Sequence, residues 1–449
     1  METPTDRIYH PRNPERSPFF KVVDRYFDQF ERIYPQKYEK DFGFWRPVIH
    51  DSVEKFRKCG DLKQGFARIK CDDCGHELLV PFSCHQRCSC PTCHQKRSLL
   101  LSVHLTDDVL AEVPHRQFVF TIPKRFRLYF RYNRELLGEL VHAAWETVNE
   151  IYSEEIVLGE TFPAMIAGIQ TFGDLINWHP HIHAIVPEGV FLASGTFCPI
   201  DTVTDEMFCN RWQEKVFRFL KKAELIDDEV IDSMKSWTFS GFSVNRDVRI
   251  EAGDKTGMMR LIQYIARCPF SLERMISVTP EGKVLYRAGK GKCYAFPKQA
   301  DPKLTAGVKR NFEVFEPLDF LVEVTQHVPL HGQHQVRMFG WYSHKKIGQR
   351  RKAKDTASES SKIDTKAVAT WAMLIKLIFE IDPFVCPKCG GNMKIISIID
   401  RKQSEVVEKI LRHCHLWNDP DPPPKPAVIP EPEFVESITY DPDFFNMIA

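Results

Sequence analysis

The sequence predicts an α+β fold in which helices cover a sheet, and three observations lead to this prediction. Segments with apolar residues three and four positions apart, typical of helices, are mixed along the chain with shorter segments typical of strands. Seven of the 14 cysteines lie between Cys59 and Cys93, which indicates a metal-binding region. His181 and His183 lie on an apolar strand. From the mixed order of the elements we expect helices on one face of the sheet.

The composition limits the class of protein and its location. With 449 residues, 43% of them hydrophobic, the chain is long enough for two or three domains. It has no apolar run of membrane-spanning length and its polar N-terminal segment lacks a signal-peptide core, so we expect a cytoplasmic protein with no membrane partner. In that compartment, cysteines in CxxC spacing are expected to bind metal rather than form disulfides.

The elements are expected in the following order. In the first helix, residues 18–34, Phe19, Val23, Phe27 and Phe30 recur at helical spacing. The same spacing predicts further helices at residues 45–58, 135–152, 206–236, 258–267 and 317–328. Apolar, β-branched and aromatic runs predict strands at residues 118–123, 164–172, 181–192, 242–250, 276–278, 284–286, 335–342 and 394–399. A Pro-Glu-Gly turn at residues 280–282 joins two of these strands in a hairpin.

The same reading divides the chain into six parts. The first three are an N-terminal helical region (1–64), a zinc-binding module (65–98) and a large α+β domain (99–344). A basic to Ser-rich linker (345–370) leads to a C-terminal module (371–417). The last part, residues 418–449, is rich in proline and acidic residues and is predicted to be disordered.

The cysteine-rich region predicts a structural zinc site. Cys71 and Cys74, with Cys90 and Cys93, form two CxxC pairs separated by fifteen residues, a spacing typical of four-thiolate zinc. Five further residues nearby could replace one of these four ligands or form a second zinc site: Cys84, Cys88, His76, His85 and His94. Cys386 and Cys389, in a Cys-Pro-Lys-Cys-Gly-Gly motif, offer half of a second zinc site whose other half the sequence does not identify.

The strand with the histidines predicts a second kind of metal site. Alternate side chains of a strand share one face, so His181 and His183 project together and can hold one cation. His179 falls on the same face and is a weaker candidate for a third ligand, because Pro180 indicates that the strand begins there. The alternative is three polar residues on a half-exposed strand. The apolar neighbours favour the metal site, because a buried imidazole without a partner is costly.

A tyrosine flanked by arginines supplies a candidate nucleophile. On a helical wheel Tyr264, Arg260 and Arg267 fall on the side opposite the apolar residues. Two guanidinium groups one turn away can orient a phosphate, and a metal can polarise it, which a weakly nucleophilic phenol requires. The alternative is an ordinary tyrosine at a helix edge.

A basic segment predicts a nucleic-acid contact, although the net charge is only +1. Residues 116–134 hold six basic residues, six aromatic residues and no acidic residue. Lys124, Arg125, Arg127 and Arg131 are the candidate phosphate contacts, with the neighbouring rings available for stacking on bases. The alternative is a strand-to-helix connection whose rings belong to the core and whose arginines are solvated.

Eight motifs in order resemble a known family: CxxCGH, SCxxR, CPxC, FTIPKR, TFGDLINWHPHIHAIVPEG, YIARCPF, FEPLDFL and CPKCGG. From about Phe20 to His415 the chain resembles the zinc-finger-bearing HUH transposases of the IS91 and common-region (ISCR-like) rolling-circle elements. The resemblance implies a ferredoxin-like antiparallel sheet with a His-hydrophobic-His nuclease site. It implies His181 and His183 as ligands of Mg²⁺ or Mn²⁺, Tyr264 as nucleophile and Arg267 as the basic residue of a Tyr-x-x-basic motif.

The implied function is transposition of a rolling-circle insertion sequence in the bacterial cytoplasm, at the nucleoid. Single-stranded DNA at transposon ends and target would be cut and joined through a 5′-phosphotyrosine intermediate, and a homo-oligomer is compatible with the sequence. Some members of the family have a second tyrosine four residues after the first; here Cys268 occupies that position, which indicates a single-tyrosine variant. The alternatives are a plasmid relaxase or replication initiator with the same site, and a non-catalytic zinc-finger DNA-binding protein.

Overall fold

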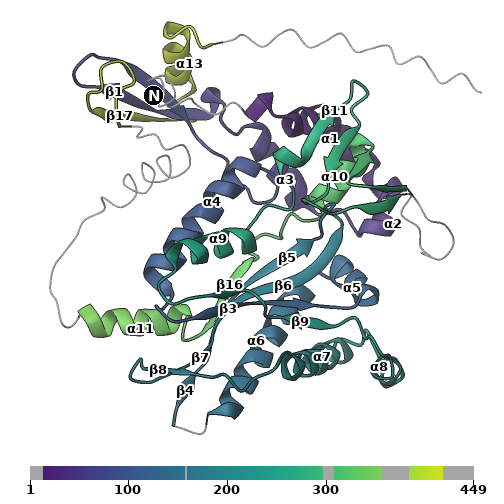
Figure 1. The fold of residues 1–449 in the computed structure, drawn as a ribbon. Coiled ribbons are helices and arrows are strands. Elements are labelled where there is room, and N and C mark those ends of the chain that lie inside the picture. The colour runs from purple at the N-terminus through teal and green to yellow at the C-terminus, as the bar shows by residue number, and fades with distance from the viewer. Residues whose placement is uncertain (1–13, 157–158, 297–307, 356–383, 418–449) are drawn as a thin grey trace, which may run out of the picture.

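A central antiparallel sheet organises the protein. The computed structural model describes residues 14–156, 159–296, 308–355 and 384–417 (Figure 1). The sheet order is β10-β3-β6-β5-β16, with β9 also paired to β3. The bounds of these strands are β3 His115–Thr121, β5 Ala164–Phe172, β6 Trp178–Pro187, β9 Ser243–Asn245, β10 Arg249–Ile250 and β16 Val336–Gly340. All of the pairings are antiparallel.

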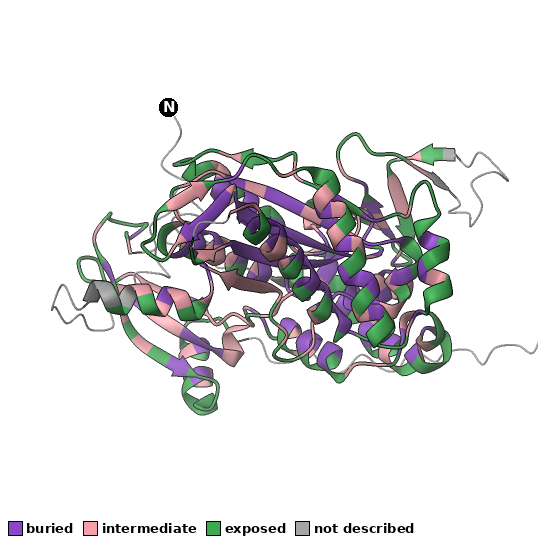
Figure 2. Ribbon diagram, turned by 90° about the horizontal axis from the view of Figure 1, so that it is seen from below, coloured by how far each residue is buried: buried purple, intermediate pink, exposed green. Residues whose placement is uncertain are grey.

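Helices cover both faces of this sheet. On one face, α6 (Leu136–Glu155) and α7 (Asp205–Lys222) pack against alternate residues of β3, β5 and β6. On the other face lie α4 (Pro91–His104) and α9 (Lys255–Ile265). The α+β class is confirmed, but the expectation of helices on one face is wrong. Every residue of β5 is buried, so both of its faces require a cover (Figure 2).

The N-terminal helices pack against a segment from late in the chain. α1 (Pro18–Lys37), α2 (Glu39–Phe42) and α3 (Pro47–Arg57) share a core with α10 (Pro317–Thr325) and with a three-stranded sheet. The strands of that sheet are β11 Met275–Val278, β12 Val284–Arg287 and β15 Phe312–Phe315. Arg46 ties the two parts together, because its Nη2 donates to the carbonyl oxygen of Thr325 at 2.9 Å.

A small sheet joins the two cysteine-bearing segments. β1 (Gly65–Cys71) pairs with β2 (Glu77–Pro81) on one side and with β17 (Met393–Asp400) on the other, and α13 (Ser404–His413) packs on it. Residues 65–98 and 371–417, expected as two modules, therefore contribute to one sheet. The expected tail at residues 418–449, and most of the linker, lie outside the described residues.

The remaining elements are short, apart from a helix where part of the linker was expected. α11 spans His344–Asp355, so the basic stretch 345–354, expected as the first part of a linker, is helical. No helix in the described part of the chain is long and apolar enough to cross a membrane. The other elements are η2 Pro14–Arg16, η3 Leu62–Gln64, η4 Leu105–Val109, η5 Lys124–Phe126, α5 Arg127–Tyr132, β4 Thr161–Phe162, β7 Gly189–Leu192, β8 Phe197–Pro199, α8 Asp228–Lys235, η6 Leu272–Arg274, β13 Tyr294–Phe296 and β14 Val308–Arg310.

Candidate active site and cysteine clusters

His181 and His183 lie side by side on β6, on the sheet face that α9 covers. Their Nε2 atoms are 3.0 Å apart, and the two residues are 7% and 3% exposed. Burial, with a smaller contribution from neighbouring cationic groups, lowers the pKa of His181 to about 4 and the pKa of His183 to about 2. Both imidazoles are therefore neutral near pH 7, which is the form that binds a metal ion.

Hydrogen bonds fix both rings. His181 donates from Nδ1 to the carbonyl oxygen of His179 at 2.7 Å, so its Nε2 carries a lone pair. Nε2 of the Gln117 side chain on β3 lies 2.8 Å from Nδ1 of His183, so in this orientation the amide donates to Nδ1, and a 180° turn of the amide brings its oxygen to the same place. When that amide presents its oxygen, Nδ1 of His183 is the protonated nitrogen and Nε2 also carries a lone pair. The Nε2 separation of 3.0 Å then suits neighbouring ligands of an octahedral cation with bonds of about 2.1 Å, as for Mg²⁺.

The structure places no third ligand of the usual types at the pair. Among the described residues, no further Cys, His or carboxylate completes a group of three with it, although the ring of His179 lies 4.9 Å from that of His181. Gln170 lies directly opposite His181 across the β5–β6 ladder and is 1% exposed. Its Oε1 is buried without a hydrogen-bond partner. A buried acceptor of this kind fits a cation or a water molecule bound to one.

Tyr264, the predicted nucleophile, packs against His183 of the histidine pair. Its ring meets the ring of His183 edge to face, with centroids 5.4 Å apart and an interplanar angle of 85°. The guanidinium carbon of Arg267 lies 4.3 Å from the centroid of the Tyr264 ring. Tyr264 is 43% exposed, so part of this residue is open to solvent. Arg260 is exposed one turn earlier and makes no ion pair or ring contact with the described residues.

Two residues of β5 set the position of the tyrosine helix. Gly168 lies opposite His183, and a Cβ at this glycine would overlap the side chain of Ile265 on α9. The glycine therefore allows the helix to approach the sheet closely. Gln170 donates from Nε2 to the carbonyl oxygens of Tyr264 at 3.0 Å and Ile265 at 2.8 Å. These contacts hold the last turn of α9 above the histidines.

The cysteines form two clusters, and the predicted zinc quartet is wrong. One cluster holds Cys59, Cys84, Cys90 and Cys93, and the other holds Cys71, Cys74, Cys386 and Cys389. Cys71 and Cys74 therefore do not share a site with Cys90 and Cys93. The unidentified partners of Cys386 and Cys389 are Cys71 and Cys74, brought to them by the pairing of β1 with β17.

Both clusters have the dimensions of a tetrahedral thiolate site. Zinc–sulfur bonds of about 2.3 Å place the sulfur atoms about 3.8 Å apart. The observed Sγ–Sγ distances are 3.6 Å for Cys59–Cys93, 3.8 Å for Cys59–Cys90 and 3.5 Å for both Cys71–Cys389 and Cys74–Cys386. Hydrogen bonds from Cys84 and Cys90 lower the pKa of Cys59 to about 7, which favours the thiolate that zinc requires. The four-thiolate chemistry fits Zn²⁺ in each case.

The first cluster is linked to the tyrosine helix through His94. Cys90 and Cys93 begin α4, and the next residue, His94, donates from Nε2 to the carbonyl oxygen of Ala266 at 2.8 Å. Nδ1 of His94 accepts from the backbone N–H of Cys88 at 3.0 Å. The cluster that begins α4 therefore also positions the C-terminal end of α9, next to Arg267.

The predicted basic segment has a mixed outcome. Phe126 and Phe130 are fully buried in the core, so they do not offer rings to bases. Arg131 is engaged, because Nη1 donates to the carbonyl oxygen of Asp41 at 2.8 Å. Lys124 and Arg125 are exposed at η5, and Arg127 is half-buried on the side of His179 and His181. The segment is partly core and partly a basic surface beside the histidines.

Several residues of the site were not predicted from the sequence. Gln117 and Gln170 carry no motif, and only the strand register shows that they border the histidine pair. Cys59 has no CxxC partner, so its spacing gave no signal. Cys84 and His94 were named only as surplus ligands; Cys84 joins the first cluster, and His94 bonds to backbone groups instead.

Two comparisons with known proteins agree with this architecture. Residues 29–122 match a family described as "Transposase zinc-binding domain", of the IS91 type, and residues 164–350 match a family described as "Putative transposase". The transposase for insertion sequence element IS801 of Pseudomonas savastanoi pv. phaseolicola is 23% identical over 80% of this chain and 85% of its own length. "Putative transposase y4qJ" of Sinorhizobium fredii is 33% identical over 28% of this chain and 31% of its own length. No solved structure matches the chain.

A zinc-binding segment followed by a transposase domain defines the class: the protein is a transposase, an enzyme that acts on DNA. The zinc-binding segment is of the IS91 type and the IS801 transposase aligns along most of both chains, so the comparisons support an IS91-like transposase.

Proposed function

We propose that this transposase cuts and rejoins single-stranded DNA at the ends of a rolling-circle insertion sequence, with Tyr264 as the nucleophile. The observation that carries the proposal is the placement of an exposed tyrosine from α9 with its ring 5.4 Å from a buried, neutral His183 on β6. His181 and His183 are the residues that would hold Mg²⁺ or Mn²⁺, which supplies charge neutralisation at the scissile phosphate. Lys124, Arg125, Arg127 and Arg260 would contact neighbouring phosphates.

In the proposed reaction, the Tyr264 oxygen attacks the phosphorus and the bond to the 3′ oxygen breaks. The phenol loses its proton and the 3′ oxygen gains one, so the products are a 5′-phosphotyrosine and a free 3′-hydroxyl. Arg267 lies against the ring of Tyr264 and is placed to contact the charged phosphate oxygens. The ester conserves the energy of the broken bond, so the reverse attack by a 3′-hydroxyl rejoins the strand without a nucleotide cofactor.

The proposed reaction uses one tyrosine as its nucleophile. The position four residues after Tyr264 is Cys268, which packs against the apolar core around α1 and α10. Burial raises the pKa of its thiol well above the usual value, so the thiolate needed for attack is disfavoured. Among the described residues near α9, Tyr264 is therefore the nucleophile that the geometry favours.

Covalent capture tests the proposal. Single-stranded oligonucleotides carrying the element's ends are incubated with the protein and Mn²⁺, and the attached residue is identified by mass spectrometry. The expected adduct is on Tyr264, and Tyr264→Phe should form none while keeping nearly unchanged affinity, because only the attacking oxygen is lost. An adduct that survives in Tyr264→Phe would show that the nucleophile is misassigned. Cleavage without any divalent ion would contradict the role given to the histidines.

A further inference from the structure

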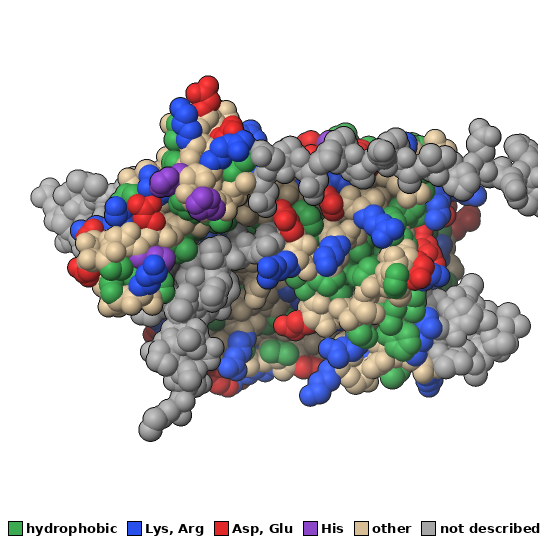
Figure 3. Space-filling model, turned by 90° about the horizontal axis from the view of Figure 1, so that it is seen from above, with side chains coloured by type: hydrophobic (Ala, Val, Ile, Leu, Met, Phe, Trp, Pro, Cys, Tyr) green, Lys and Arg blue, Asp and Glu red, His purple; other side chains and the backbone are tan. Residues whose placement is uncertain are grey.

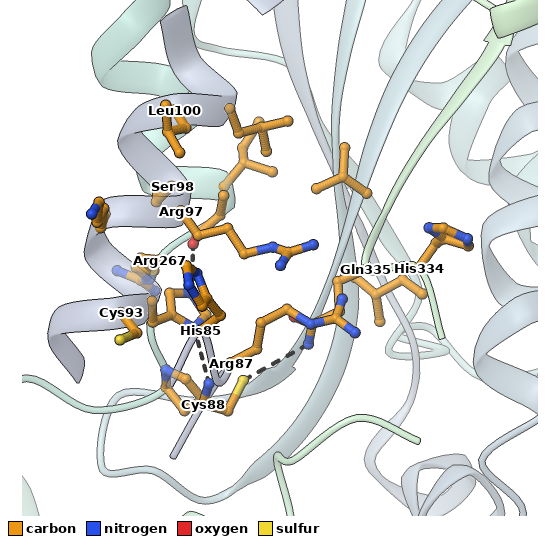
Figure 4. A pocket seen from close by; sticks show the side chains of 18 of the residues that line it. His85, Arg87, Cys88, Cys93, Arg97, Ser98, Leu100, Arg267, His334 and Gln335 are labelled. Atoms are coloured by element: carbon orange, nitrogen blue, oxygen red, sulfur yellow. Dashed lines mark hydrogen bonds between the residues drawn. The ribbon is translucent and has the colours of Figure 1, made fainter. Parts of the chain in front are cut away.

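A cavity of about 520 Å³ lies beside the C-terminal end of α9, and neither His181 nor His183 lines it. The cavity is enclosed by α4, by the C-terminal end of α9 and by residues of β5 and β16. Residues 83–88, between β2 and α4, close one end of it (Figure 4). Arg267 belongs to both places, because it lines the cavity and also lies over the ring of Tyr264. The cavity is therefore adjacent to the proposed nucleophile.

The lining of this cavity is strongly basic. Arg87, Lys96, Arg97 and Arg267 line it, and no aspartate or glutamate does. Arg87 and Arg97 extend their side chains into the space, and neither has an ion-pair partner among the described residues. On the face seen from above, by contrast, basic and acidic side chains are interspersed (Figure 3). The cavity is thus a local concentration of positive charge in a protein whose net charge is +1.

The proximity of two unpaired guanidinium groups requires an explanation. Burial and, next, the positive charge of Arg97 lower the pKa of Arg87. Holding like charges together in a partly enclosed space is unfavourable unless an anion neutralises them. Guanidinium groups bind phosphate oxygens through paired N–H donors, and backbone phosphates are the anions that a DNA-processing enzyme meets.

We propose that this cavity binds backbone phosphates of the single-stranded DNA that the enzyme acts on, next to the phosphate attacked by Tyr264. The inference rests on the proposed function, since the strand in the cavity is the strand that the tyrosine would cut. A space of this size admits part of one nucleotide chain but not two paired strands. Arg267, at the boundary, connects the bound segment to the reacting phosphate.

The test measures binding separately from cleavage. All variants are made in the Tyr264→Phe protein, so that affinity is read without covalent attachment. A fluorescein-labelled oligothymidylate, longer than the roughly 4–16 nucleotides that single-strand sites usually cover, is titrated across a range of salt concentrations. Each lost phosphate contact to a single strand lowers the log–log salt slope by about 0.7, so Arg87→Ala with Arg97→Ala should lower it by about 1.4.

A matched control and a milder variant accompany the double variant. Arg218→Ala with Lys222→Ala removes the same charge from exposed positions on α7, on the opposite face of the sheet, and should leave the slope unchanged. Arg97→Ala alone, at an exposed position, should lower the slope by about 0.7 and tests the proposal even if loss of Arg87 disturbs the fold. Zinc content and thermal unfolding report on the integrity of each variant.

The competitors identify the bound anion. Inorganic phosphate and thymidine monophosphate, added at constant ionic strength, should not displace the oligonucleotide at concentrations where unlabelled oligothymidylate does. Displacement by either small anion together with an unchanged slope in the double variant would make the cavity a small-anion site and overturn the proposal. An equal loss of affinity for duplex DNA would overturn the assignment to a single strand. Failure of Tyr264 to form an adduct would contradict the nucleophile but leave these binding results intact.

Discussion

Replacement of Gln117 tests how the histidine pair is prepared for a metal ion. Gln117 is 6% exposed, and its amide lies 2.8 Å from Nδ1 of His183. Gln117→Leu replaces the glutamine with an apolar side chain of similar size. It removes the amide group that selects which ring nitrogen of His183 is protonated. Loss of such a supporting partner weakens metal binding about 10- to 100-fold, which corresponds to about 1.4–2.7 kcal/mol. A buried Nδ1–H left without an acceptor costs a similar amount, about 1–3 kcal/mol.

The assay is a Mn²⁺ titration followed by electron paramagnetic resonance, in parallel with oligonucleotide cleavage at each metal concentration. Gln117→Leu should shift both midpoints upward by the same factor, and saturating Mn²⁺ should restore most of the cleavage. Gln117→Glu should retain wild-type affinity or exceed it, because a carboxylate accepts the Nδ1 proton and raises the basicity of the ring. Gln213→Leu on α7 serves as a control at a distant position. An unchanged midpoint in Gln117→Leu would refute the orienting role.

Three further predictions concern the fold and its metals. Gly168→Ala should lower stability by about 1–3 kcal/mol in thermal unfolding, because the added Cβ overlaps α9, whereas Gly348→Ala, with open space around it, should not. Cys386→Ser should reduce zinc from two ions per chain to one, measured by elemental mass spectrometry, while Cys88→Ser, outside both clusters, should leave two. Burial lowers the pKa of His115 to about 4, below the ordinary value near 6.5, so the unfolded chain takes up the proton first as the pH falls. The free energy of unfolding that neutral His115 contributes is complete above pH 6.5 and falls by about 1.4 kcal/mol per pH unit between pH 6.5 and pH 4. Urea unfolding should show a smaller dependence on pH in His115→Gln than in the wild-type protein.

Local patterns predicted many of the elements, although residues 206–236 form two helices, α7 and α8, and β1, β2 and α4 were not expected. Residues 164–172 were expected as a strand from their apolar character and form β5 with the same bounds. The helix of Tyr264 was likewise expected from its apolar face, and Tyr264 lies on the exposed side as the wheel placed it. These features depend on residues a few positions apart, where periodicity carries the information.

Features that depend on distant pairing were not predictable in the same way. Cys74, one of the partners of Cys386, is 312 residues away in the sequence. Nothing in the CxxC motif of Cys74 specifies the CxxC motif of Cys386 as its partner. The roles of Gln117 and Gln170 depend on which residues face His181 and His183 across two strand pairings. A single sequence indicates that strands exist but does not fix the register in which they pair. The residues that orient the two histidine rings could therefore be identified only from the structure.

The second cysteine cluster also has a consequence for synthesis of the chain. Cys71 and Cys389 are 318 residues apart. At about 5–20 residues per second, a ribosome needs roughly 15 s to 1 min to reach the second after the first. Throughout that interval Cys71 and Cys74 are an incomplete thiol pair, and β1 lacks its neighbour β17. The first cluster, whose members span only residues 59–93, can close much earlier. On the nascent chain the first cluster can therefore close before the second, which is completed only after the whole central α+β domain has been made.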